Sequence, residues 1–290
     1  MVSVALLFLT LLLAPRTAQA HAIDAADAGW IFGAEPWVLI LLAASLWLYA
    51  AGYLRLRKRS RAGRPRLARH ALLFGFGWLA LAIALVGPLD ALGAKLFSAH
   101  MLQHEMLMIV AAPLLVLGRP LAVWIWALPS RGALSAATLS PLVKLPWTFL
   151  TRPAVSWLLH AVALWAWHVP RFFEAALAYP SIHAWQHASF LGSALLFWWS
   201  ALGDGIDRPV RAGAMLYLFT TMLHTGALGA LLTWSSVPWY PVYAATTADY
   251  GYSLLEDQQL GGLIMWVPGG LAYVLAGLAL AARWLQRARA

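Results

Sequence analysis

A series of apolar stretches, each about twenty residues long and nearly free of charge, constrains the fold of this chain more than any other feature. A helix of that length, rising about 1.5 Å per residue, spans the ~30 Å hydrocarbon core of a bilayer. The predicted spans are 35–54, 71–90, 96–117, 153–169, 183–203, 212–233 and 259–282. We therefore predict an all-α, polytopic membrane helical bundle of about seven transmembrane helices, with residues 21–290 as one transmembrane domain.

Composition supports a membrane protein and excludes several other classes. Hydrophobic residues make up 62% of the chain and charged residues 11%, whereas soluble domains are about a quarter charged. The 17 Trp residues suit the aromatic belts at membrane interfaces. The net charge of +9 does not indicate nucleic acid, because the basic residues lie in loops between the spans. The absence of cysteine excludes disulfides, thiolate metal sites and thiol redox chemistry.

Loop charge predicts the orientation of the bundle. Of the 20 Lys and Arg residues, 17 fall in the first, third and fifth loops and the C-terminal tail, which share one side of the predicted membrane. The opposite loops hold Lys95 and Arg171. Because cytoplasmic loops carry the excess of basic residues, we expect the mature N-terminus outside and the C-terminus inside.

Two segments outside the spans carry their own expectations. Residues 1–20 combine a short apolar run with the small-residue end Ala18-Gln19-Ala20, which is typical of a cleaved signal peptide. The connection 118–152 holds four prolines among several tryptophans. We expect it to lie along the membrane interface rather than to cross the bilayer.

Six of the nine histidines fall near the outer ends of four predicted spans: His100, His104, His168, His183, His187 and His224. Ionisable side chains inside a bilayer are rare, and they usually face the bundle interior with partners. The pairs His100/His104 and His183/His187 are spaced i,i+4, which places both rings of a pair on one helix face. We expect the two pairs to supply the core ligands of a metal or proton site, with His168 and His224 next and His160 dispensable. The six could also form two adjacent sites, or only interhelical hydrogen bonds.

Neighbouring side chains indicate the ion. Met101 and Met108 flank the first histidine pair, and Met265 lies on a glycine-containing stripe of the last span. Imidazole with thioether and no thiolate suits copper, particularly Cu(I), although imidazole alone would also admit zinc, iron or nickel. Glu105 could orient a ligand or relay a proton. Methionine also commonly fills gaps in a core.

Enzyme motifs do not match. A zinc protease would need the pattern H-E-x-x-H or its inverse H-x-x-E-H. Here Met101 follows His100, and Gln103 stands where the inverse pattern requires glutamate. The acidic pair Glu256 and Asp257, at the mouth of the last span, indicates either attraction of cations or a solvated loop end. We therefore predict a metal-handling protein that is not an enzyme.

The histidine-containing motifs resemble those of a known family, the CtaG-type cytochrome c oxidase assembly factors. The matching segments are 98–104 (SAHMLQH), 167–170 (WHVP), 183–187 (HAWQH), 222–229 (MLHTGALG), 238–241 (PWYP) and 256–266 (EDQQLGGLIMW). The resemblance covers nearly the whole mature chain. It implies a bacterial inner-membrane protein that is needed to make active haem–copper oxidase by delivering copper. Its implied partners are oxidase subunits and periplasmic copper chaperones.

Two alternatives from other classes stay open. Histidines on facing helices could be axial ligands of haem, although six shallow histidines suit a smaller ion. A copper or other metal transporter would need a path through the bundle, and alternating-access carriers place their sites near the midplane. The predicted ligands instead stop in the outer half of the membrane, which favours an assembly factor.

Overall fold

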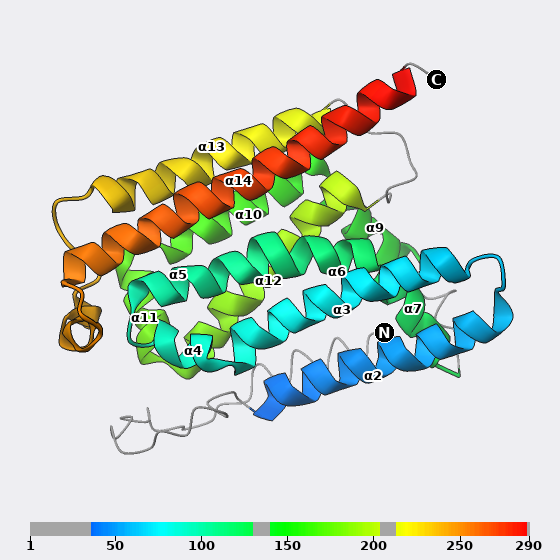
Figure 1. Ribbon diagram of the computed structural model, residues 1–290, viewed down its shortest axis with the longest axis horizontal. Coiled ribbons are helices and arrows are strands. Elements are labelled where there is room, and N and C mark those ends of the chain that lie inside the picture. The colour runs from blue at the N-terminus through cyan, green and yellow to red at the C-terminus, as the bar shows by residue number, and fades with distance from the viewer. Residues whose placement is uncertain (1–35, 130–139, 204–212, 289–290) are drawn as a thin grey trace.

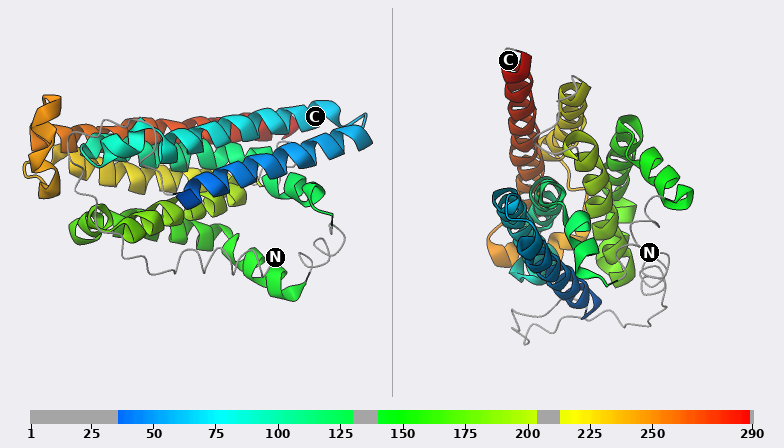
Figure 2. Two further views of the ribbon diagram at one scale, coloured as in Figure 1. Left: turned by 90° about the horizontal axis from the view of Figure 1, so that it is seen from below. Right: turned by 90° about the vertical axis from the view of Figure 1, so that its right-hand side faces the viewer.

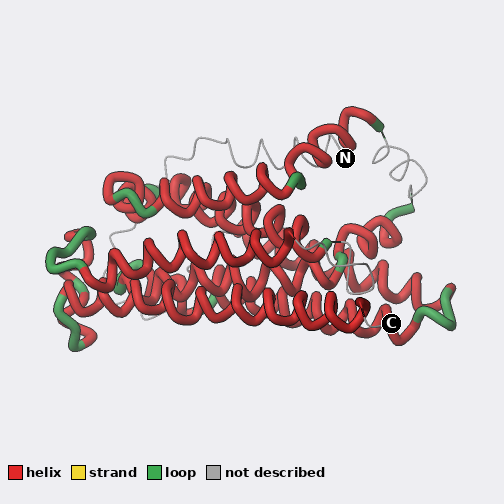
Figure 3. Tube along the Cα trace, turned by 90° about the horizontal axis from the view of Figure 1, so that it is seen from above, coloured by secondary structure: helices red, strands yellow, loops and turns green. Residues whose placement is uncertain are grey.

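The computed structural model describes residues 36–129, 140–203 and 213–288 of the 290. The expected signal peptide at 1–20 lies outside these residues. Within them the chain is helical and contains no β-strand (Figure 3). The helices follow one long axis, and most connecting loops lie at its two ends (Figure 1; Figure 2, left).

The elements follow one another as helices throughout the described residues. They are α2 (Pro36–Arg59), α3 (Arg64–Val86), α4 (Pro88–Gly93), α5 (Phe97–Glu105), η1 (Met106–Ala111), α6 (Ala112–Gly118), α7 (Pro120–Ala127), α9 (Pro141–Leu150), α10 (Pro153–Trp167), α11 (Pro170–Ala178), α12 (Pro180–Leu202), α13 (Gly213–Trp234), η2 (Pro241–Ala245), η3 (Thr247–Tyr250) and α14 (Leu254–Ala288). Many begin at proline, whose fixed φ and missing N–H suit the first turn of a helix.

Five helices in the described part of the chain are long and apolar enough to cross a membrane. They are Pro36–Arg59, Arg64–Val86, Phe97–Gly118, Gly213–Trp234 and Leu254–Gln286. These confirm the all-α membrane bundle. Of the other two predicted spans, α10 is apolar but has 15 residues, and α12 has 23 residues with several polar side chains in its first half. The total of seven spans therefore stays a prediction.

The connection 118–152 forms two short helices in its described residues. Arg119 adopts a left-handed conformation with φ of 52°, which ends α6 and lets α7 begin at Pro120 in a new direction. α7 packs on α2, where the backbone of Val123 lies so close to Gly52 that a Cβ there would collide. α9 buries none of its side chains. Its exposure agrees with the expected position at the interface, which stays a prediction.

The helix that carries the first histidine pair is the most buried of the five. In Phe97–Gly118, 61% of the most apolar window is buried, against 39% or less in the other four. The helix contains a π-helical segment, η1, directly after Glu105. There the indole Nε1 of Trp198 on α12 donates a 2.8 Å hydrogen bond to the carbonyl of Met108. The most buried of the five long helices therefore also has an irregular backbone, directly after Glu105. π-Helical turns inside α-helices are frequent at functional sites.

α13 and α14 pack with their backbones nearly in contact. A Cβ on Gly229 would lie 2.8 Å from the carbonyl oxygen of Gly262, and a Cβ on Gly262 would lie 2.7 Å from that of Gly229. Small residues permit such close approach of membrane helices. Gly262, on the glycine-containing stripe of the last span, is therefore a point of close helix contact.

Candidate metal centre

Five of the six predicted histidines converge near one end of the bundle. α5 supplies His100 and His104, α12 supplies His183 and His187, and His168 is the C-cap of α10. The ring centroids lie 4.3 Å apart in the first pair and 4.2 Å apart in the second. Between the helices, the rings of His104 and His187 lie 5.3 Å apart. Each i,i+4 pair therefore shares a helix face, and the two faces meet.

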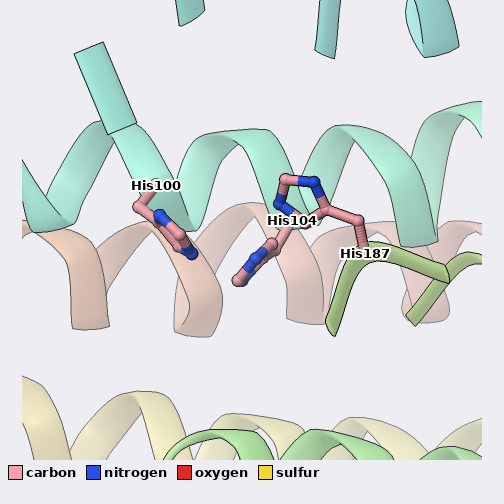
Figure 4. A group of neighbouring side chains, drawn as sticks. All are labelled: His100, His104 and His187. Atoms are coloured by element: carbon pink, nitrogen blue, oxygen red, sulfur yellow. The ribbon is translucent and has the colours of Figure 1, made fainter. Parts of the chain in front are cut away.

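Three of these imidazoles form the tightest group, which we call the inner trio: His100, His104 and His187. Each can offer a nitrogen such that all three ligand atoms lie within 4.8 Å of one another. Figure 4 shows the three rings approaching one another from α5 and α12. His100 and His104 are each 1% exposed, and His187 is 9% exposed. The inner trio is thus enclosed by the bundle rather than open on its surface.

The ring nitrogens of the inner trio lack hydrogen-bond partners. Nε2 of His100, both nitrogens of His104 and Nε2 of His187 are buried and have no partner among the described residues. A buried polar atom left unpaired costs about 1–3 kcal/mol, so native proteins retain few of them. A bound cation would use one nitrogen lone pair from each neutral ring, since the other nitrogen of that ring carries a proton. The residues present therefore fit a metal ion.

Neighbouring backbone orients two of the rings. His100 donates from Nδ1 to the carbonyl of Gly93 at 3.3 Å, and His168 donates from Nδ1 to the carbonyl of Leu164 at 2.7 Å. In a neutral imidazole this leaves the lone pair on Nε2. Such outer hydrogen bonds fix the tautomer and orientation of metal-binding histidines.

His168 and Met101 present two ligand atoms at the edge of the cluster. Nε2 of His168 lies 3.3 Å from Sδ of Met101, whose side chain is fully buried. With the His168 proton on Nδ1, both atoms carry lone pairs. Two ligands of one tetrahedral ion with bonds of about 2.0–2.3 Å lie roughly 3.3–3.8 Å apart. The separation therefore suits a shared soft cation, which is the role the sequence suggested for Met101.

The structure places His224 and His160 away from this cluster. His224 packs its ring against Trp157 at 5.1 Å, and neither of its nitrogens has a partner among the described residues. His160 contacts Ser193 Oγ through Nδ1 at 3.1 Å and the hydroxyl of Tyr273 through Nε2 at 3.5 Å. His160 therefore makes hydrogen bonds inside the bundle, and its dispensability stays a prediction. Of the six histidines predicted as ligands, His224 is the one that lies outside the cluster.

The remaining predicted residues line the core between α5 and α14. Glu105 is 6% exposed, and its Oε2 has no hydrogen-bond partner among the described residues. A Cβ on Gly269 would lie 3.0 Å from this oxygen, so glycine makes room for the carboxyl group. Met108 and Met265 are buried in the apolar core. Among the described residues, Glu105 belongs to neither group of converging imidazole and carboxylate ligand atoms.

Asp90 on α4 is a site residue that the sequence analysis missed. It can offer a ligand atom within 4.8 Å of those of His183 and His187. Its Oδ1 accepts a 2.7 Å hydrogen bond from Gln103 Nε2, and Gln103 donates another to the carbonyl of Ala84. The only signal in the sequence was a carboxylate at the end of the second predicted span, 71–90.

Asp257 also has a role that the sequence did not show. Its side chain is fully buried at the start of α14 and accepts hydrogen bonds from the backbone N–H groups of Phe97 at 2.7 Å and Ser98 at 3.1 Å. A carboxylate in this position caps the free N–H groups of α5 and complements its dipole. Asp257 therefore anchors the helix that carries His100 and His104, rather than sitting in a solvated loop.

A bundle of apolar membrane helices with a buried imidazole cluster near one end defines a polytopic membrane protein with a candidate metal centre. The family model of cytochrome c oxidase caa3 assembly factors (Caa3_CtaG) matches residues 47–287. The chain belongs to this family of cytochrome c oxidase assembly factors, which confirms the resemblance found in the motifs. Membership of an assembly-factor family suggests a non-catalytic role.

Three mycobacterial proteins are similar to the chain. Uncharacterized proteins of Mycobacterium bovis and Mycobacterium tuberculosis are each 28% identical to it over 251 residues. An uncharacterized protein of Mycobacterium leprae is 26% identical over 249 residues. The matches cover 82–83% of this chain but only 37% of each relative's length. No solved structure matches the chain.

Proposed function

We propose that this protein binds copper in its histidine cluster and delivers it to cytochrome c oxidase during assembly. The observation that carries the proposal is the inner trio, in which buried nitrogens without hydrogen-bond partners converge within 4.8 Å. Copper is the cargo in this scheme, so the site must hold the ion and also release it. The oxidase subunits are the proposed recipients, and periplasmic copper chaperones are the proposed donors.

The set of ligands favours Cu(I). Imidazoles and the Met101 thioether are available, and the chain has no cysteine. Thioether and imidazole without thiolate select copper among the biological first-row metals better than oxygen ligands do. The same geometry argues against haem, since three imidazoles clustered within 4.8 Å leave no slot between them for a porphyrin ring.

The arrangement of the bundle supports delivery on one side of the membrane. α4, α11 and the start of α5 lie at one end, whereas the α2–α3 loop and the C-terminal end of α14 lie at the other (Figure 1). The second end carries most of the basic residues. We place the basic end in the cytoplasm by the positive-inside rule, and the histidine cluster near the periplasm of the inner membrane. An oxidase whose copper is inserted from the periplasm could then receive it directly.

Copper loading of the purified protein tests this function. Full-length protein in detergent, treated with Cu(I) under anaerobic conditions, should retain about one copper ion per inner trio. His104→Ala should abolish this retention, because it removes a central ligand from a site of three. His160→Ala is the matched control, and it should retain wild-type copper. Elemental analysis gives the stoichiometry, and thermal unfolding shows whether each variant is folded.

Two results would contradict copper binding. One is wild-type protein that holds no copper after loading and dialysis. The other is a folded His104→Ala protein with unchanged copper stoichiometry. A haem absorption band in the protein as isolated would instead support the haem-binding alternative.

A further inference from the structure

We propose that Asp90, His183 and His187 form a second cation site, for a divalent ion such as Zn²⁺, Co²⁺ or Cu²⁺, beside the inner trio. We call these three residues the outer group. Two of its three residues, Asp90 and His183, lie outside the inner trio, and His187 is shared between the two groups. The second site does not require that the inner trio binds copper.

The first argument is convergence from separate elements. Asp90 lies on α4, and both histidines lie on α12, yet the three can offer ligand atoms within 4.8 Å of one another. Two ligands of a tetrahedral ion with bonds of about 2.0–2.2 Å lie roughly 3.5 Å apart. The ligand atoms of the outer group lie at most 4.8 Å apart, so they need to approach one another by at most about 1.3 Å to enclose an ion.

The second argument is that two ring nitrogens of the outer group are unpaired. Nε2 of His183 and Nε2 of His187 are buried and have no hydrogen-bond partner among the described residues. A carboxylate beside two such nitrogens provides one negative charge and three ligands. That combination holds a divalent cation and leaves a position for water or for a partner's ligand.

The third argument is that the carboxylate is fixed in place. Gln103 Nε2 donates to Oδ1 of Asp90 at 2.7 Å and to the carbonyl of Ala84 at 2.7 Å, and the Gln103 side chain is fully buried. Since one Asp90 oxygen is engaged in this way, the other is available to an ion. Gln103 lies between His100 and His104 on α5, so the same helix turn supports both groups.

The chemistry of the two groups predicts different ions. Oxygen and nitrogen ligands together suit borderline divalent cations, whereas imidazole with thioether suits Cu(I). Their accessibility differs as well. Asp90 and His183 are partly exposed, whereas His100 and His104 are each 1% exposed. An ion arriving from the end of the bundle would therefore meet the outer group before it could reach the inner trio.

Paired metal titrations test the second site. Co²⁺ is the probe for the outer group, since its visible spectrum reports ligand geometry, and Cu(I) competition with a chelator is the probe for the inner trio. Asp90→Asn keeps the side-chain shape and the acceptor for Gln103. It should weaken Co²⁺ binding by more than about tenfold, the loss that removal of an outer-shell partner alone can cause. Its Cu(I) affinity should stay unchanged.

Three further variants make the assignment specific. His183→Ala should behave like Asp90→Asn, whereas His100→Ala should lose Cu(I) and keep Co²⁺. His187→Ala should weaken both ions, because His187 belongs to both groups. Asp249→Asn changes an exposed carboxylate and should alter neither.

The outcomes separate this site from the copper function. The second site is refuted if wild-type protein takes up no Co²⁺ or Zn²⁺, or if folded Asp90→Asn binds Co²⁺ as tightly as wild type. It is also refuted if Asp90→Asn and His100→Ala each lose both ions, which would mean a single site. Wild-type protein that binds Co²⁺ through Asp90 but takes up no Cu(I) would retain the second site and refute the copper proposal.

Discussion

At the scale of single residues, the contacts of each ring nitrogen decide whether a buried histidine here can hold an ion. His100 uses Nδ1 on the Gly93 carbonyl, which leaves Nε2 unpaired. His160 engages both nitrogens, with Ser193 and Tyr273. Both side chains are 1% exposed, so burial does not distinguish them. Their hydrogen bonds do, and this explains why we assign a ligand role only to His100.

Asp257 gives a residue-scale prediction. Asp257→Ala should lower the free energy of unfolding by about 1–3 kcal/mol, because it leaves buried N–H groups at the start of α5 without an acceptor. It should also weaken copper binding, since α5 carries two of the inner trio. Thermal unfolding in detergent and Cu(I) titration measure the two effects.

The matched control for Asp257 is Asp249→Ala, which removes an exposed carboxylate in η3, before α14. It should leave both stability and copper affinity unchanged. Equal stability of the two variants would show that the cap on α5 contributes nothing to the fold.

At the scale of elements, the contact between α13 and α14 depends on the absence of side chains. A Cβ on Gly262 would lie 2.6 Å from Thr233 Oγ1 and 2.7 Å from the carbonyl oxygen of Gly229. The second contact is with backbone, which cannot move without shifting a helix. The two helices are thus held at a separation that only glycine permits.

Gly262→Ala should therefore destabilise the bundle by about 1–3 kcal/mol, the usual cost of overpacking. Gly277→Ala, on the same helix, is the matched control, since a Cβ there meets no atom within 4 Å. It should be neutral or should stabilise the protein by up to about 1 kcal/mol, because alanine favours a helix interior. Thermal unfolding of the two variants in one detergent makes the comparison, and equal loss in both would contradict the packing argument.

At the scale of the whole molecule, the two ends of the bundle differ in chemistry. The converging histidines lie on helices that begin or end near α4, α11 and the start of α5, at one end of the bundle (Figure 1). The basic α2–α3 loop and the C-terminal end of α14 lie at the other end. Viewed along the long axis, the helices pack side by side as one bundle (Figure 2, right). This polarity suits an ion that enters and leaves at one end.

Deletion of the protein should lower cytochrome c oxidase activity in membranes, and excess copper in the medium should restore part of it. The physical reason is mass action, since a high copper concentration can load the oxidase without a dedicated donor. Cytoplasmic copper should not change. Oxidase assays and elemental analysis of cell fractions measure these outcomes, with His104→Ala as the variant that fails to complement and His160→Ala as the one that does.

Protein-dependent uptake of copper into proteoliposomes would contradict one-sided delivery. It would make the protein a transporter, and the path would then have to pass the inner half of the bundle. Full oxidase activity after deletion at limiting copper would instead contradict any role in supplying the ion.

The sequence alone determined the class of fold and the histidine pairs, because both depend on local chemistry. Apolar length predicted the membrane helices, and the i,i+4 spacing of His100/His104 and His183/His187 placed each pair on one face. The predicted spans 153–169 and 183–203 agree with α10 (Pro153–Trp167) and α12 (Pro180–Leu202) to within three residues. The predicted span 71–90 fits less well, because α3 begins seven residues earlier, at Arg64. The apolar length of a segment does not locate the ends of its helix, because tertiary packing can stabilise helical residues beyond the apolar stretch.

Only the tertiary structure decided which faces meet. It brought Asp90 to the second histidine pair and set the Asp257 carboxylate on Phe97, 160 residues away along the chain. It left His224 against Trp157 instead of in the cluster. The rotation of each helix about its axis depends on packing against its neighbours, such as the glycine contact of α13 with α14. That information lies in no single segment, so spacing along the chain could not supply it.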